Sequence, residues 1–181
     1  VWGGDGDISS IDYGGGGTSE LDEITDVIDI FSTDNAFAAL RENGQVITWG
    51  RGSYGGDSSG VDFNVDGTPG VVRIFSTRSG FAALKSDGSV VIWGHAGSGG
   101  TNNTGVDLGS GVTWVFSNHF SFAALKQDGS VVIWGHSNYG ADSTGVDLTN
   151  VVEIFSTQTA FAALKQDGTV VTWGDSGFGG D

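Results

Sequence analysis

The sequence VVEIFSTQTAFAALKQDGTVVTWG, residues 151–174, contains three strand patterns and one tight turn. Residues 151–156, 160–165 and 169–173 are rich in β-branched, aromatic and aliphatic side chains, which favour strands. Asp167-Gly168 separates the second and third runs and is typical of a two-residue hairpin, because glycine readily adopts the positive φ angles of that turn. The segment therefore predicts a three-stranded unit that contains a hairpin.

The same pattern recurs along the chain at intervals of 39 to 47 residues. Phe-Ser, Phe-Ala-Ala-Leu and Trp-Gly follow one another in every copy, and fixed order with nearly fixed spacing predicts a tandem-repeat array. The Trp-Gly markers stand at 49–50, 93–94, 134–135 and 173–174, with another at 2–3. We expect a single repeat array over residues 1–181. Its units are predicted at about 4–50, 51–94, 95–135 and 136–174, with partial units at 1–3 and 175–181.

The strands also predict how the units pack. Residues 131–134 and 161–164 are apolar at consecutive positions, which is typical of a sheet covered on both faces. Propeller blades are covered in this way, and a period near 40 residues fits them, whereas the coils of a β-helix are usually shorter. We predict an all-β, propeller-like array of about four three- to four-stranded blades. Four blades are the smallest ring, and the partial units favour an incomplete one.

Charge and composition exclude several classes of protein. The chain has 22 acidic residues against 7 Lys and Arg, a net charge of −15. Phosphate binding needs a basic surface, so a nucleic-acid partner is not expected. No apolar run approaches the length of a membrane span, so we expect no membrane insertion. The absence of cysteine excludes disulfides and thiolate metal sites.

The repeat resembles a known family. Ile-Phe-Ser-Thr at 154–157, Phe-Ala-Ala-Leu-Lys at 161–165, Asp-Gly, Trp-Gly and Phe-Gly-Gly at 178–180 resemble the regulator of chromosome condensation (RCC)-type repeat. The resemblance implies a β-propeller, typically seven-bladed, and the family's best-known activities are guanine-nucleotide exchange on a small GTPase and chromatin binding. This variant of the repeat is similar to repeats found in long secreted bacterial surface proteins. The family's usual Gly-His before the second strand is missing here.

The histidines do not indicate an active site. A hydrolytic triad needs a nucleophile, a base and an acid in contact, and the chain has only His95, His119 and His136. His95 and His136 occupy one equivalent position, where another unit has Arg51, so we interpret this as a variable, exposed loop position. We predict no catalytic residues and no enzyme.

Aspartates at repeated spacing are candidate calcium ligands. Asp57 and Asp62 are five residues apart, and Asp142 and Asp147 repeat the spacing. Calcium binds several oxygen ligands, so the sequence allows a calcium site, the one cofactor considered. The alternative is an Asx turn, in which each carboxylate accepts from its own backbone.

Four of the seven bases, Arg41, Lys85, Lys126 and Lys165, stand two residues before an Asn-Gly or Asp-Gly turn. We interpret them as exposed residues on the shoulder of each hairpin that help solubility.

The third unit departs most from the pattern. Trp114 stands where the other units have Asp29, Arg73 and Glu153, and His119 and Phe120 follow it. Polar residues at the equivalent positions predict that Trp114 faces solvent, so these three residues are candidates for a binding surface. The alternative is that the glycine-rich loops cover them.

These observations favour a non-catalytic structural or adhesive binding segment of a larger secreted or cell-surface protein. The partner would be a protein, a glycan or a second copy of the chain. The alternative is a regulatory propeller that docks a protein partner, as a guanine-nucleotide exchange factor does.

Overall fold

The computed structural model describes residues 24–63, 70–101 and 105–181, and this part of the chain folds into four three-stranded antiparallel sheets. The predicted all-β blades are therefore confirmed, with three strands each. The predicted partial unit at 1–3 lies outside the described residues. The strands are β1 (Val27–Ser32), β2 (Ala36–Arg41), β3 (Val46–Gly50), β4 (Val71–Ser76), β5 (Gly80–Lys85), β6 (Val90–Gly94), β7 (Val112–Ser117), β8 (Ser121–Lys126), β9 (Val131–Gly135), β10 (Val151–Ser156), β11 (Ala160–Lys165) and β12 (Val170–Gly174).

All four sheets share one register. The phenylalanine of the second strand pairs with the tryptophan of the third, as in Phe122↔Trp134. A β-bulge interrupts each first strand after its first residue, for example between Val112 and Trp114. The hairpin glycine between the second and third strands has a positive φ in every sheet, such as +85° at Gly168, as the Asp-Gly signal predicts.

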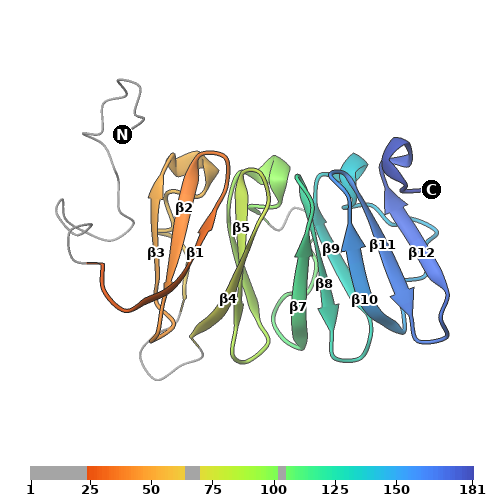
Figure 1. The fold of residues 1–181 in the computed structure, drawn as a ribbon, viewed down its shortest axis with the longest axis horizontal. Coiled ribbons are helices and arrows are strands. Elements are labelled where there is room, and N and C mark those ends of the chain that lie inside the picture. Colours follow the sequence, from red (N-terminus) through yellow and green to blue (C-terminus); the bar gives the residue numbers. More distant parts are fainter. Residues whose placement is uncertain (1–23, 64–69, 102–104) are drawn as a thin grey trace.

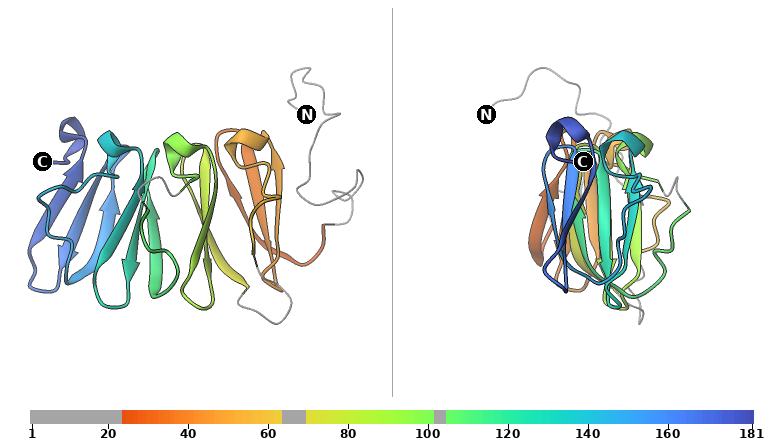
Figure 2. Two further views of the ribbon diagram at one scale, coloured as in Figure 1. Left: turned by 180° about the vertical axis from the view of Figure 1, so that it is seen from behind. Right: turned by 90° about the vertical axis from the view of Figure 1, so that its right-hand side faces the viewer.

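The sheets stand side by side in chain order, like consecutive blades (Figure 1). A one-turn 3-10 helix follows each third strand: η3 (Gly52–Tyr54), η4 (Ala96–Ser98), η5 (Ser137–Tyr139) and η6 (Ser176–Phe178). These helices lie along one edge of the array, which we call the helix edge (Figure 2). The first strands of consecutive sheets, β1, β4, β7 and β10, contact one another. Among the described residues, no helix is long and apolar enough to cross a membrane.

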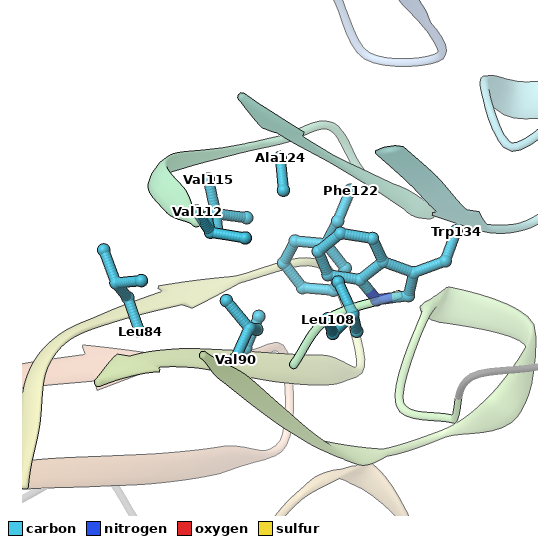
Figure 3. Close-up of a cluster of buried hydrophobic side chains, with 9 residues drawn as sticks. Leu84, Val90, Leu108, Val112, Val115, Phe122, Ala124 and Trp134 are labelled. Atoms are coloured by element: carbon cyan, nitrogen blue, oxygen red, sulfur yellow. The ribbon is translucent and has the colours of Figure 1, made fainter. Parts of the chain in front are cut away.

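The hydrophobic core lies between the sheets rather than on one side of them. Leu84 and Val90 of the second sheet pack with Val115, Phe122 and Trp134 of the third (Figure 3). In β8, Ala124 belongs to this cluster, whereas its neighbour Ala123 belongs to the cluster shared with the fourth sheet. Both alanines are fully buried. Each inner sheet therefore packs against a neighbouring sheet on both of its faces. This explains why its strands are apolar at consecutive positions.

A repeated contact, which we call the blade lock, joins consecutive sheets. The Trp134 indole N–H donates to the Gly99 carbonyl at 3.1 Å, and the Phe122 ring stacks on the indole with centroids 5.1 Å apart. Gly99 has φ +80°, and a Cβ there would lie 2.6 Å from the Phe122 ring. Only glycine therefore admits the ring and its backbone conformation together. Trp93 bonds to Gly55, and Trp173 to Gly140, in the same way.

Replacing the lock glycine tests its role in stability. We expect Gly140→Ala to cost about 1–3 kcal/mol more than Gly145→Ala, because a Cβ at Gly140 would lie 2.6 Å from the Phe161 ring whereas Gly145 faces open space. Both glycines have positive φ, so the backbone strain is similar. Urea unfolding measures the difference. Equal losses would show that the ring does not need this glycine.

Candidate functional site

In each sheet, a hydrogen bond from the first residue of the turn between the first and second strands anchors that turn at the helix edge. In the second sheet, Thr77 Oγ1 donates to the Ser98 carbonyl at 2.7 Å and accepts from the Gly80 amide at 3.1 Å. In the third sheet, Asn118 takes the same place, and its amide donates to the Tyr139 carbonyl at 2.6 Å. The first residue of each turn therefore fixes the turn to the 3-10 helix that follows its own sheet, and in the structure a unit means a sheet together with that helix.

The second residue of each turn is hydrogen-bonded to the next sheet through its backbone. The Asp34 amide donates to the Arg78 carbonyl at 2.9 Å, the Arg78 amide to the His119 carbonyl at 3.0 Å, and the His119 amide to the Gln158 carbonyl at 3.0 Å. Four different side chains, acidic, basic, imidazole and amide, thus stand in a row at fixed spacing.

A groove of about 930 Å³ runs along these turns. We call it the turn groove. Its lining is polar and comes from equivalent positions of all four sheets: residues 32–34, 76–78, 117–119 and 156–158. The Arg78 guanidinium pairs with the Asp34 carboxylate at 2.6 Å, and both side chains are about half exposed. The groove is therefore lined by serine and threonine residues, one carboxylate, one guanidinium group and one imidazole.

An aromatic cluster adjoins the turn groove at the third sheet. Phe120 lies 4.8 Å from the Tyr139 ring, and Tyr139 lies 4.6 Å from the His136 ring, measured between centroids. His119 packs on Phe120 at 6.1 Å. His136 is half-buried, and its Nδ1 is buried with no hydrogen-bond partner among the described residues. The expected exposed loop position therefore holds for His95 but not for His136.

Trp114 lies elsewhere, in β7. Its side chain is 39% exposed, its ring meets Phe75 edge-on at 5.5 Å, and the Arg73 guanidinium lies 4.4 Å from the ring centroid. Among the described residues, no ring contact joins Trp114 to His119 or Phe120. The three residues predicted to form one surface thus contact two different groups of neighbours.

Three of the four candidate calcium ligands, Asp57, Asp142 and Asp147, form Asx turns. Asp57 Oδ1 accepts from the Ser59 amide, and Asp142 Oδ1 from the Thr144 amide, both at 2.9 Å. Asp147 accepts from Thr149, and the Asp62 carbonyl accepts from Lys85. No group of three or more His, Asp or Glu side chains that could hold a metal occurs within the described ranges. The hydrogen bonds fit the Asx-turn alternative.

The repeated bases do more than the sequence interpretation assigned to them. Lys165 Nζ bonds to the Asp147 carboxylate at 2.6 Å, and Lys126 Nζ to that of Asp107 at 3.2 Å. Lys85 is itself buried. Each lysine fastens the long loop that precedes its sheet. The signal was available in the sequence, because Gly-Val-Asp recurs at 60–62, 105–107 and 145–147 ahead of each lysine.

The repeat and its fold are similar to those of known proteins. The family model of the regulator of chromosome condensation (RCC1) repeat matches residues 27–55, the first described unit up to the start of its glycine-rich loop. The matched unit is therefore similar to the RCC1 repeat. This confirms the resemblance to the RCC-type repeat, since the other three sheets keep the register of the matched one, whereas the likeness to repeats of bacterial surface proteins stays a prediction. No curated protein sequence matches the chain.

Solved structures share the fold of these RCC1-type blades. Human WBSCR16 has a TM-score of 0.59 at 21% identity, over 82% of this chain and 47% of that one. Yeast RCC1 (Prp20), solved bound to Kap60, has a TM-score of 0.58 at 19% identity, over 82% and 43%. The CRINKLY WD40 ectodomain of the Arabidopsis thaliana receptor kinase ACR4 has 0.55 at 18%, over 82% and 52%. The chain thus spans only about half of each structure.

Trp114→Glu tests which way this residue faces. Glu restores the acidic residue found at this position in other units and can pair with Arg73, so we expect a loss of only about 1–2 kcal/mol in the free energy of unfolding. Val115→Glu, one residue further along β7, is the matched control. It places a charge in the core and should abolish folding. Circular dichroism during heating distinguishes the two, and a Trp114→Glu protein that fails to fold would show that Trp114 is a core residue.

The loop contact of Lys165 has a pH signature. Hydrogen bonds from Lys165 and Thr149 lower the pKa of Asp147 to about 2. A carboxylate whose pKa is lowered on folding contributes stability above its unfolded pKa of about 3.9, and this is lost as the pH falls through about 2. We expect Lys165→Met to raise the Asp147 pKa, followed by NMR titration of the Thr149 amide. Asp142, which has no lysine partner, should titrate unchanged. An unaltered Asp147 midpoint would contradict the contact.

Proposed function

We propose that this chain is a non-catalytic, protein-binding segment of an RCC1-type propeller, and that its turn groove receives an extended stretch of a partner protein. One observation carries the proposal: equivalent turns are held in a row by backbone hydrogen bonds, yet each presents a different side chain. Such an arrangement gives a fixed spacing with a varied chemistry, which is what a specific binding surface needs.

The division between anchoring and variable positions supports this assignment. The first residue of each turn is Thr or Asn and is engaged in bonds to its own unit. The next position varies among Asp34, Arg78, His119 and Gln158 and lines the groove. Fold stability constrains the first position, whereas the second is open to variation that a partner can read.

The nature of the partner follows from charge. The net charge of −15 favours association with a basic segment, because long-range attraction raises the rate of encounter. In the groove, a Lys or Arg of the partner can share the half-exposed Asp34 carboxylate with Arg78, and His119 with the adjoining Phe120 supplies flat faces for stacking. The structural relative yeast RCC1 was solved bound to another protein, Kap60, which supports a protein as the class of partner.

The non-catalytic part of the proposal rests on the histidines. His95 Nδ1 accepts from the Gly97 backbone amide, and His119 packs on Phe120. In the described part of the chain, no Ser or Thr hydroxyl is hydrogen-bonded to a histidine side chain. A nucleophile activated by an adjacent base is therefore not supported.

We further propose that the segment acts outside the cell or at its surface, as a structural or adhesive element. The absence of cysteine in a strongly acidic, near-uniform array is compatible with this location, and the relative in ACR4 is an ectodomain. A regulatory propeller that docks a signalling protein is the second candidate, and the Kap60 complex of yeast RCC1 favours it. Both candidates use the turn groove to bind protein.

A displayed peptide library tests the binding function. We expect the immobilised chain to enrich basic peptides whose affinity falls at least about tenfold in the triple variant Asp34→Gln, His119→Gln, Phe120→Thr, measured by calorimetry. Each substitution installs the residue that stands at the same position in the fourth unit, so folding should be kept. His95→Asp, the residue of the fourth unit at that position, is the matched control outside the groove.

Two results would count against the proposal. Peptides that bind the triple variant as tightly as the unchanged chain would place the binding surface elsewhere. Retention of glycans on an array, with no peptide enriched, would replace a protein partner by a glycan.

A further inference from the structure

The two end sheets of the described array carry complementary halves of the blade lock. In each lock, a phenylalanine and a tryptophan of one sheet insert against a glycine of the preceding unit. The contact is repeated three times between four sheets, which leaves one insertion pair at the first sheet and one receiving glycine after the last. We propose that these ends bind each other, so that a second copy of this chain associates head to tail.

The first sheet presents the insertion half already assembled. Phe37 and Trp49 stack at 5.3 Å, as Phe122 and Trp134 do at 5.1 Å. Phe37 is nevertheless 45% exposed, whereas Phe122 is fully buried. No partner for the Trp49 indole N–H occurs among the described residues. The ring pair therefore has the geometry of the lock without its receptor.

The strand next to this pair shows the same contrast. Ile30 of β1 is 56% exposed, whereas the equivalent residues Ile74, Val115 and Ile154 of the later sheets are buried. Those three contact the preceding sheet in every case. The outer face of the first sheet thus has the composition of a face that is buried between two sheets, but it is exposed to solvent.

The last unit presents the receiving half. Gly179 has φ +93°, close to Gly55 at +101° and Gly140 at +111°. A Cβ at Gly55 or Gly140 would strike a phenylalanine ring of the next sheet, whereas one at Gly179 would meet nothing within 4 Å. The backbone at Gly179 therefore already has the conformation of a receiving glycine, and the space that a phenylalanine ring would fill is open.

Apolar side chains surround this receiving glycine. Phe155 of β10 is 54% exposed, while the equivalent Phe75 and Phe116 pack against the sheet that follows them. Val170 of β12 is 61% exposed, whereas the equivalent Val90 is buried. The outer face of the fourth sheet is therefore complementary to the outer face of the first sheet, in the same way as the facing surfaces of the second and third sheets are complementary.

The direction of the backbone hydrogen bonds between the turns of consecutive sheets indicates the same order of the two copies. The earlier sheet donates its amide and the later sheet accepts, as in His119 to Gln158. A second copy placed after the fourth sheet would bring the Asp34 carbonyl to the Gln158 amide, which has no partner among the described residues. Its Trp49 would meet the Gly179 carbonyl. One placement satisfies both bonds.

The contact is heterologous, since the two faces differ, and it generates a ring or an open stack according to the rotation between copies. Two copies contribute eight blades, which lies within the range of known propellers. The occupant is a second copy because this chain supplies both halves of a contact that it already forms three times internally.

Complementary variants test this inference on the full 181-residue chain by sedimentation velocity. We expect the unchanged chain to self-associate. Phe37→Asp and Phe155→Asp should each weaken association at least about a hundredfold, because each removes one half from every copy. An equimolar mixture of the two variants should form a one-to-one dimer, since one intact pair of faces remains. Val72→Asp, an exposed apolar residue of β4 away from both ends, should leave association unchanged.

Three outcomes would overturn the inference. The unchanged chain could stay monomeric at all concentrations, which would show that the two end faces do not bind each other. Loss of association in Phe37→Asp but not in Phe155→Asp would indicate pairing of two first sheets. A mixture that stays monomeric would exclude the head-to-tail contact. Thermal unfolding of each variant verifies that it is folded.

Discussion

The contact between a phenylalanine–tryptophan pair and the glycine of the preceding unit is the constraint on which the rest of the structure depends. A three-stranded sheet with apolar side chains on both faces cannot be stable alone, because each face must be removed from water. The blade lock fixes the distance and the rotation at which the next sheet covers that face. It also holds the 3-10 helix against the following sheet, and this helix in turn anchors the turn that lines the groove. Core packing and binding surface are therefore set by one repeated contact.

The sequence predicted the features that depend on neighbouring residues. The Asp-Gly hairpins, the three strands per unit and the covering of both faces follow from local composition and periodicity. The lock itself was not predicted, although its tryptophan was the most visible marker. Gly55 and Trp93 are 38 residues apart, and nothing in a local pattern shows that a loop glycine of one unit receives the indole of the next.

The candidate surface shows the same limit. Trp114 and His119 are close in sequence, but strand residues rise about 3.3 Å each, so five residues separate them by roughly 16 Å. His119 reaches the helix edge while Trp114 remains in β7 beside Arg73 and Phe75. Phe120 instead meets His136 and Tyr139, which come from the next connection of the same unit. Repeat comparison therefore identified unusual residues correctly as unusual, but could not say which of them touch.

The basic residues connect this architecture to the charge of the surface. The chain has seven. Lys85, Lys126 and Lys165 fasten loops, and Arg41 bonds to the carbonyl of Thr25. Arg51 and Arg73 lie over aromatic rings, and Arg78 pairs with Asp34. Every base is thus engaged in a contact within the fold, and several of those contacts are with backbone carbonyls or rings rather than with carboxylates. The chain has 22 acidic residues against these seven bases, a net charge of −15, so the overall field around the molecule is negative. A negative field raises the rate of encounter with positively charged segments, and this is the physical basis for proposing a basic partner.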